Sequence, residues 1–140
     1  MQLLKHIQIF RKAYENMLNE IASQYNIANN EIKILLFLDK NEDTDIAKDI
    51  VDMLILSKSH VSMSVERLVQ KGYLQKVQDE SDKKKKHLKM AESAKELIKE
   101  ADKKEKSFFN KMYNGITEEE KETMNQIFEK MYRNIKNDNI

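Results

Sequence analysis

The sequence of 140 residues contains no proline and only two glycines. Proline ends or kinks a helix because its ring clashes with the preceding turn, and glycine weakens a helix through its backbone entropy. The rest of the chain is rich in lysine, glutamate, leucine, isoleucine and methionine, which helices accommodate well. We therefore expect a mainly α-helical protein in which Gly72 and Gly115 each end a helix.

The composition excludes several classes of protein. No run of about 18 apolar residues is present, so the sequence offers no membrane span. Cysteine is absent, which excludes disulfides and thiolate catalysis. The first residues lack the basic start, apolar stretch and cleavage site of a signal peptide, so we expect a cytoplasmic protein of one ordinary domain.

The spacing of apolar residues predicts six amphipathic helices. Asn29 or Asn30 can cap the second helix, Asp45 the third and Ser57 the fourth, and Thr117–Glu120 forms a capping box for the sixth. The expected helices cover approximately residues 2–25, 29–40, 46–54, 58–71, 91–114 and 118–135.

A β-hairpin is expected between the fourth and fifth helices. Residues 73–77 alternate in polarity, 78–82 are polar and turn-like, and 87–90 suggest a returning strand. The third and fourth helices, joined by a tight turn, form a candidate helix-turn-helix, and the hairpin then takes the place of a wing. The predicted fold is a winged helix-turn-helix. Proteins of this class bind DNA through the second helix of the helix-turn-helix motif, which here is the fourth helix of the chain.

The distribution of charge is uneven along the middle of the chain. Residues 29–56 contain three lysines against seven acidic residues, whereas residues 57–90 contain nine basic residues against four acidic ones. A local basic surface is typical of a phosphate-binding element. The alternative is a solvated, lysine-rich loop without a binding role.

Four segments of the sequence together resemble the MarR family of bacterial regulators. The segments are Ser57-Lys58-Ser59-His60-Val61-Ser62, then Leu68, then Lys71-Gly72-Tyr73-Leu74, then Asp82-Lys83-Lys84. Upstream, residues 27–35 resemble a further family segment, with Glu31 at its acidic or amide position. The resemblance covers nearly the whole chain, and it implies six helices with one wing.

The sequence departs from the family pattern at three places. Ile55 occupies the usual turn glycine position, and since a β-branched residue disfavours positive φ, we expect the turn to differ in detail. Lys83 and Lys84 replace two arginines of the wing, and lysine lacks the planar fork of arginine. Residues 90–94 lack the family's capping threonine and its glycine at the entry to the fifth helix.

The outward positions of the fourth helix are the first candidate DNA contacts. The N-terminal half of such a helix meets base edges in the major groove, which favours Ser59, His60, Ser62 and Met63. We expect Ser57 and Lys58 to meet phosphate, aided by the helix N-terminus. Arg67 either reaches phosphate or guanine, or pairs with Glu66 or Asp79.

The wing supplies the second set of candidate contacts. Lys83, Lys84 and Lys85, followed by Lys86, are placed to approach the minor groove or its phosphates. The resemblance implies that Asp82 holds Lys84 in place rather than touching DNA. The alternative is a lysine loop that does not bind.

The outer helices are expected to form a dimer. The seam of the first helix and the apolar face from Met124 to Ile135 are too extensive for a small monomer to cover, and such patches mark interfaces. A symmetric homodimer places two recognition helices about 34 Å apart and prefers a pseudo-palindromic operator in double-stranded DNA. The resemblance implies dimerisation through the first, fifth and sixth helices. We expect an N-terminal dimerisation helix over 1–28, a DNA-binding domain over 29–90 and C-terminal dimerisation helices over 91–140.

The sequence therefore predicts a sequence-specific transcriptional regulator, and the resemblance implies a repressor released by a small-molecule effector. The alternative is a dimeric winged-helix module that binds a protein partner without DNA specificity.

No nucleophile–base pair or nucleotide-binding loop is recognisable, so we expect no enzyme activity and no cofactor. His6, His60 and His87 have no metal-ligand spacing, so no metal site is expected. The methionines fill the core or line an adaptable ligand pocket.

Overall fold

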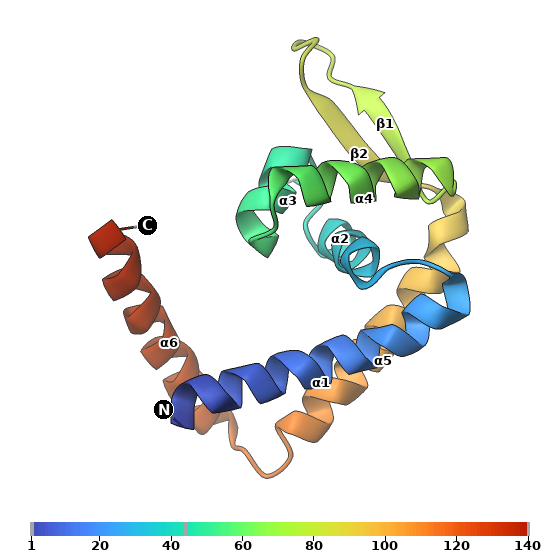
Figure 1. The fold of residues 1–140 in the computed structure, drawn as a ribbon. Coiled ribbons are helices and arrows are strands. Elements are labelled where there is room, and N and C mark those ends of the chain that lie inside the picture. Colours follow the sequence, from blue (N-terminus) through green and yellow to red (C-terminus); the bar gives the residue numbers. More distant parts are fainter. Residues whose placement is uncertain (1, 44, 140) are drawn as a thin grey trace. The chain divides into compact units, whose positions relative to one another are not determined.

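A computed structural model describes residues 2–43 and 45–139 of the chain (Figure 1). The predicted mainly α-helical fold with six helices and a two-stranded wing is confirmed. Its elements are α1 (Gln2–Tyr25), α2 (Asn29–Lys40), α3 (Ala47–Leu54), α4 (Lys58–Gln70), β1 (Leu74–Gln78), β2 (Lys86–Met90), a 3-10 turn η1 (Glu92–Ala94), α5 (Lys95–Met112) and α6 (Glu118–Asn139).

The described residues divide into two compact units between Phe108 and Phe109, within α5. The first unit contains α1 to α4, the wing and most of α5, and the second contains the end of α5 and α6. Among the helices that the structure describes, none combines the length and the apolar character of a membrane span.

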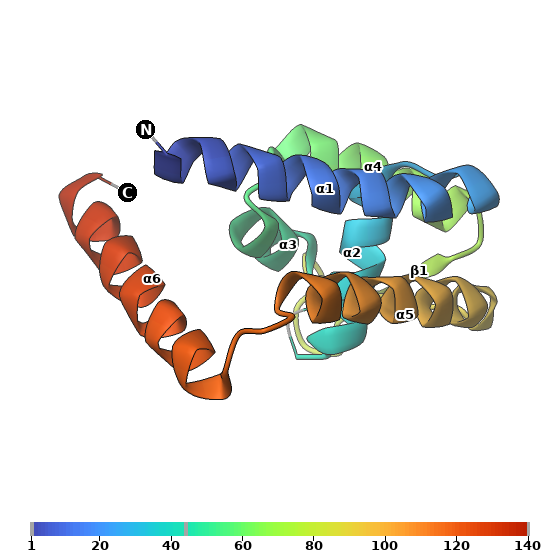
Figure 2. The ribbon, with the colours of Figure 1, turned by 90° about the horizontal axis from the view of Figure 1, so that it is seen from below.

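The core of the first unit is built around α2. Figure 1 shows α1 and α5 on the side of α2 that faces away from α4, and in Figure 2 α2 is seen between α1 and α5. The α4 helix also packs against α2. Each fully buried leucine or isoleucine contributes about 2 kcal/mol of hydrophobic stabilisation. The fully buried leucines and isoleucines are Leu18, Ile21, Ile32, Ile34, Leu35, Ile50, Leu68, Leu74 and Leu97.

Both ends of α4 are fixed by local sequence. The Ser57 hydroxyl accepts a hydrogen bond from the His60 amide at 3.1 Å, so the predicted N-cap is confirmed. At the other end, Gly72 adopts φ +82°, and the amides of Gly72 and Tyr73 donate to Val69 and Leu68 carbonyls. This pair of bonds is a Schellman motif, which requires the left-handed conformation that glycine adopts without strain.

Two other predicted caps are wrong. Asn29 lies inside α2 and donates to the Asn19 and Glu15 side chains on α1, while the Ala28 amide donates to the buried Glu31 carboxylate. The N-cap of α3 is Ile46 without a side-chain hydrogen bond. The Asp45 carboxylate instead pairs with His87 and Lys89 on strand β2 of the wing.

The start of α5 differs from the expected helix start, whereas the end of α5 and the start of α6 agree with the sequence. The expected fifth helix begins with the 3-10 turn η1 rather than as an α-helix at Ala91, whose side chain cannot cap it. Gly115 has φ +82° after the end of α5. The Thr117 hydroxyl accepts from the Glu120 amide at 3.1 Å, and the Thr117 amide donates back to Glu120 at 3.4 Å, so the capping box is confirmed.

The turn between α3 and α4 does not avoid the left-handed conformation. Ile55 adopts φ 53° and ψ 47°, and its side chain is 90% exposed. The expectation that isoleucine alters this turn is therefore wrong. The backbone keeps the conformation that glycine would adopt, and the chain carries the steric strain of a β-branched residue there.

The wing is an antiparallel hairpin in which Leu74 pairs with Met90 and Gln78 with Lys86. Leu74 and Leu88 are buried, so one face of the hairpin covers the core. In Figure 1 the strands extend beyond α3 and α4, away from α1 and α5.

The second unit consists mainly of α6, a helix without a buried residue over 118–137. Its apolar side chains form a row at spacings of three and four. Large exposed apolar residues also occupy the N-terminal half of α1. The exposed residues on α6 are Ile127, Phe128, Met131, Tyr132 and Ile135, and those on α1 are Leu3, Leu4, Ile7, Ile9 and Phe10.

Candidate DNA-binding site

The outward face of α4 collects the residues predicted to meet DNA. Val61, Val65 and Leu68 are buried against the core, which fixes the rotation of the helix. The opposite face is therefore solvent-exposed. All seven predicted residues of this segment are exposed: Ser57, Lys58, Ser59, His60, Ser62, Met63 and Arg67.

The two pairing partners considered for Arg67 are engaged elsewhere. Glu66 pairs with Lys76 at 2.8 Å, and Asp79 contacts His87 at 2.6 Å. Among the residues that the structure describes, Arg67 forms no ion pair. Its guanidinium is thus available to an external anion, which agrees with the phosphate or guanine contact expected from the sequence.

A groove of about 870 Å³ lies between α3, α4 and the wing. Apolar side chains, including Val51, Val61 and Leu88, form part of its lining. Asp82 is the sole acidic side chain among the described residues that line it. The basic lining residues are Lys48, Lys58, Lys76, Lys84, Lys85 and Lys86.

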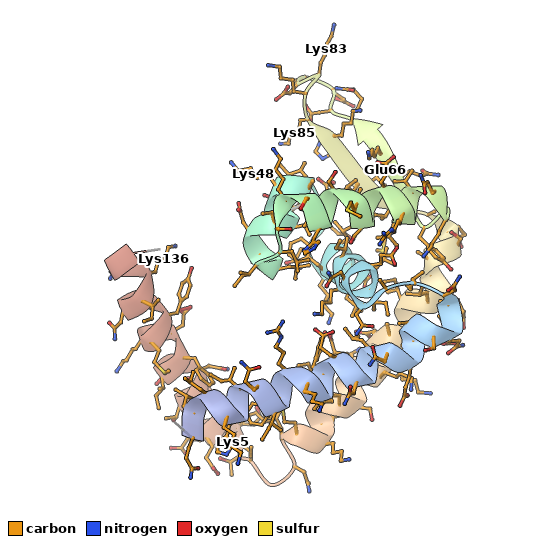
Figure 3. All side chains as sticks on the ribbon, viewed as in Figure 1. Lys5, Lys48, Glu66, Lys83, Lys85 and Lys136 are labelled. Atoms are coloured by element: carbon orange, nitrogen blue, oxygen red, sulfur yellow. The ribbon has the colours of Figure 1, made fainter. Side chains whose placement is uncertain are left out.

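The groove has the electrostatics of a site for a polyanion. Figure 3 shows Lys83 at the tip of the wing and Lys85 lower on the wing, on the side of Lys48 from α3. The N-terminus of α4 adds a partial positive charge beside Lys58. Lysines from three elements thus line one groove, in which a nucleic-acid backbone could lie.

Two of these lysines, Lys48 and Lys76, are not among the contacts that the sequence predicts. Strand alternation is the signal that could have found Lys76, because it shares a face of the hairpin with the buried Leu74. Lys48 lies in the first turn of α3, where sequence alone does not show that the wing lies opposite.

The turn of the wing is held by its own carboxylates. Asp79 accepts from the Ser81 amide at 3.0 Å and from the Asp82 amide at 2.9 Å. Asp82 accepts from the Lys84 amide at 2.9 Å. Asp82 thus holds Lys84 through its backbone, which leaves the exposed lysine side chains directed outward.

The base of the wing is tied to the connection between α2 and α3. The two ring nitrogens of His87, Nδ1 and Nε2, lie 2.6 Å from Asp45 and Asp79 carboxylate oxygens. The second oxygen of Asp45 accepts from Lys89 at 2.9 Å, and the Asp45 carbonyl accepts from the Leu88 amide at 2.8 Å. These bonds join β2 to the start of the helix-turn-helix.

The charges at this junction shift one another's pKa. Hydrogen bonds to Asp45 and Asp79 raise the pKa of His87 above its usual value. The hydrogen bond from His87 and those from the turn amides hold the pKa of Asp79 well below its usual range. Burial works to raise the pKa of Asp45, but hydrogen bonds from His87 and Lys89 outweigh it, so that pKa is also lowered.

The three histidines lie on different elements: His6 on α1, His60 on α4 and His87 on β2. Within residues 2–43 and 45–139, no group of three His, Asp or Glu side chains is arranged to hold a metal ion.

Two short helices joined by a tight turn, followed directly by a basic hairpin, define a winged helix-turn-helix. Residues 27–94 match the protein family described as "Winged helix DNA-binding domain". This segment contains α2, α3, α4 and the wing, and therefore the whole groove.

The whole chain shares its fold with MarR-family structures. A MarR family transcriptional regulator from Listeria monocytogenes, complexed with 26mer DNA, is similar with a TM-score of 0.85 and 23% identity, over 96% of this chain and 89% of that one. A MarR protein from Peptoclostridium difficile is similar with a TM-score of 0.83 and 20% identity, over 98% and 89%.

A third similar structure is an organohalide-sensing transcriptional regulator in a form bound to 2,4-dichlorophenol. Its TM-score is 0.72 at 21% identity, over 95% of this chain and 79% of that one. No curated protein sequence matches the chain. The fold that the sequence resemblance implies, six helices with one wing, is thus shared with MarR-family structures, and the segment that matches a winged helix DNA-binding domain lies at its centre.

Proposed function

We propose that the protein is a sequence-specific, double-stranded DNA-binding transcriptional regulator of MarR type. The observation that carries this proposal is the groove between α3, α4 and the wing, where six lysines and one acidic residue lie beside an exposed recognition helix. A DNA-binding regulator acts on the chromosome, so we place it in the cytoplasm.

In this proposal α4 enters the major groove. Ser59, His60, Ser62 and Met63 meet base edges, because they are exposed near the N-terminal end of the helix. The methionine suits the methyl group of thymine, while the serine hydroxyls and the imidazole supply hydrogen bonds. Ser57, Lys58 and Arg67 flank this set and hold the phosphate backbone, with Arg67 also able to reach guanine.

The wing then follows the DNA backbone beside α4. Lys83, Lys84 and Lys85 carry exposed ammonium groups on a turn whose backbone is fixed by Asp79 and Asp82. Lysine is a point charge without a fork, so we expect these contacts to strengthen binding more than they discriminate sequence. Each phosphate contact steepens the log–log dependence of affinity on salt by about one unit.

We further propose that the regulator is a homodimer. The apolar rows on α1 and α6 are exposed in the single chain, and a second copy would remove them from water. Residues 1–28 and 91–140 then serve dimerisation, while 29–90 bind DNA. A two-fold dimer presents two copies of α4 about 34 Å apart and reads a pseudo-palindromic operator.

A repressor role with release by a small-molecule effector is the regulatory part of the proposal. The organohalide-sensing regulator bound to 2,4-dichlorophenol, which shares this fold, supports an effector of small phenolic or lipophilic type. Physically, the effector must favour a spacing of the two heads that does not fit the operator.

The experiment that tests the proposal is selection from random double-stranded DNA at near-physiological salt, followed by a salt titration on the selected site. We expect an inverted repeat to be enriched and affinity to fall steeply with salt. His60→Ala should weaken binding to the selected site more than to random duplex, because it removes a base contact rather than a phosphate contact.

A dimeric winged-helix module that binds a protein partner is the competing function. It predicts no enriched sequence and weak, sequence-independent duplex binding. That outcome would overturn the DNA-binding proposal and make a pull-down with the intact dimer the next step.

A further inference from the structure

A chain of charged side chains crosses the junction between the wing and the helix-turn-helix. His87 on β2 bridges Asp45, in the connection between α2 and α3, and Asp79, in the turn after β1. The Asp45 side chain is 10% exposed and the His87 side chain 25% exposed, so the bridge is partly shielded from water. None of the three residues belongs to the proposed DNA contacts.

With both carboxylates ionised, the geometry of this bridge fits a doubly protonated ring. Both ring nitrogens lie 2.6 Å from a carboxylate oxygen, and an ionised carboxylate can only accept hydrogen bonds. A neutral imidazole carries only one N–H. The lone pair of its other nitrogen would then repel the lone pairs of the second carboxylate. The charged ring satisfies both carboxylates at once.

Each end of the bridge fixes a different part of the site. Asp45 directly precedes the N-cap of α3 and also holds Lys89 and the Leu88 amide of β2. Asp79 holds the wing turn through the amides of Ser81 and Asp82. The protonated ring therefore connects the frame of α3 to the turn from which the wing lysines project.

We propose that Asp45, His87 and Asp79 form a positioning clamp for the wing, which makes DNA affinity depend on the protonation of a histidine that lies outside the DNA contacts. The proposal rests on the DNA-binding function proposed above. Loss of the proton breaks one of the two ring contacts and frees the wing turn from α3. The wing lysines then lose their fixed relation to α4.

The direction of the pH dependence follows from the three groups of the bridge and from the charged side chains around Asp45. Lys89 pairs with Asp45, and Asp39 and Glu42 line the same small pocket. The pKa of His87 is raised, so the clamp is complete below the ordinary histidine value of about 6.5 and is lost as pH rises through the raised pKa. The pKa values of Asp45 and Asp79 are lowered, so both stay ionised down to pH values below their ordinary range.

The first experiment observes the ring itself, without DNA. Long-range proton–nitrogen NMR spectra of the intact protein, assigned by the loss of one ring in His87→Gln, report the protonation of both nitrogens. We expect both Nδ1 and Nε2 of His87 to be protonated at pH 6.5 and the midpoint to lie above that of a free histidine. A single neutral tautomer at pH 6.5 would overturn the clamp.

The second experiment uses two carboxylates of the same turn as a matched pair. Asp79→Asn and Asp82→Asn each remove one negative charge from the wing turn, and of these two residues it is Asp79 that contacts His87. We expect operator affinity of the wild-type protein to fall as pH rises from about 6.5. Asp79→Asn should move this fall to lower pH, and Asp82→Asn should leave its midpoint in place.

The salt dependence gives a readout that a merely structural role would not change. Once the clamp opens, the slope of log affinity against log salt should become shallower by about one for each wing lysine that leaves a phosphate. His87→Gln should abolish this alkaline change, and its melting curve shows whether the variant is folded. His60→Gln should weaken binding yet keep the alkaline fall.

The two proposals fail in different ways. If no DNA is bound at any pH while the NMR titration shows the protonated bridge, the DNA-binding function fails and the bridge remains. If operator DNA is bound with the same affinity and salt slope on both sides of the His87 midpoint, the positioning clamp is overturned and the DNA-binding function remains.

Discussion

At the scale of single residues, the left-handed backbone conformation of Ile55 is the least expected from the sequence. Its φ of 53° lies in the left-handed region, which a β-branched residue disfavours. The reason is that the turn geometry is set by the packing of α3 on α4, with Ile50 and Val61 buried. Tertiary packing thus decides the backbone, and the residue at the turn accepts the strain.

Replacing this residue should stabilise the fold. We expect Ile55→Gly to raise the free energy of unfolding by about 1 kcal/mol, because glycine adopts the left-handed region without a Cβ clash, even after its extra entropy in the unfolded state. The measurement is thermal or urea unfolding.

Met53→Gly is the matched control, since Met53 is also an exposed apolar residue but has helical backbone. It should lower stability by about 1 kcal/mol. A loss of stability in Ile55→Gly would contradict the strained-turn account.

The role of Asp45 could not be predicted from neighbouring residues alone. Its position before α3 is typical of an N-cap, and the local sequence indicates no other role. Its carboxylate instead contacts His87, which is 42 residues away in the chain. A bond of that separation becomes visible only once the wing is placed against the helices.

At the scale of elements, the sequence predicts most of the secondary structure. The helix ends are set by neighbours in the chain, as with Ser57 and Gly72 around α4, and the hairpin by its alternation and polar turn. The candidate site is predicted less completely. The α4 face and the wing tip follow from helix and hairpin patterns, whereas Lys48 joins the groove through the placement of α3 against the wing.

The wing lysines give a prediction at this scale. Lys84→Ala should reduce affinity for all duplexes by a similar factor and lower the log–log salt slope by about one, since it removes one phosphate contact without a base contact. Fluorescence anisotropy on the selected operator and on random duplex measures both quantities.

Lys103→Ala on α5 is the control, because it removes the same exposed charge from a helix outside the groove. Its salt slope should equal that of the unchanged protein. A Lys84→Ala variant with an unchanged slope would show that the wing does not meet phosphate.

At the scale of the whole molecule, the exposed apolar rows are the feature that a single chain leaves unexplained. Phe128 is 47% exposed and Ile127 52% exposed, although both are large hydrophobic side chains. Aromatic residues on a dimer interface contribute much of its binding energy.

Phe128→Glu should therefore convert the dimer to a monomer and weaken operator binding strongly, because a monomer engages one half-site. The fold of the monomer should survive, since Phe128 is not buried within its own chain. Sedimentation velocity measures the assembly, and circular dichroism measures the helix content.

Lys130→Glu changes the charge of an exposed polar residue on the same helix and should leave the dimer intact. If Phe128→Glu sediments as the unchanged protein does, α6 is not part of the interface and the dimer proposal needs another surface.

The groove also has a kinetic consequence for the whole molecule. The net charge is +1, so the protein as a whole is drawn only weakly to nucleic acid, whereas the six groove lysines form a concentrated positive field on one side. Such a molecule turns its reading face toward a polyanion before contact, which raises the fraction of productive encounters. Salt should therefore slow its arrival at the operator as well as loosen the finished complex.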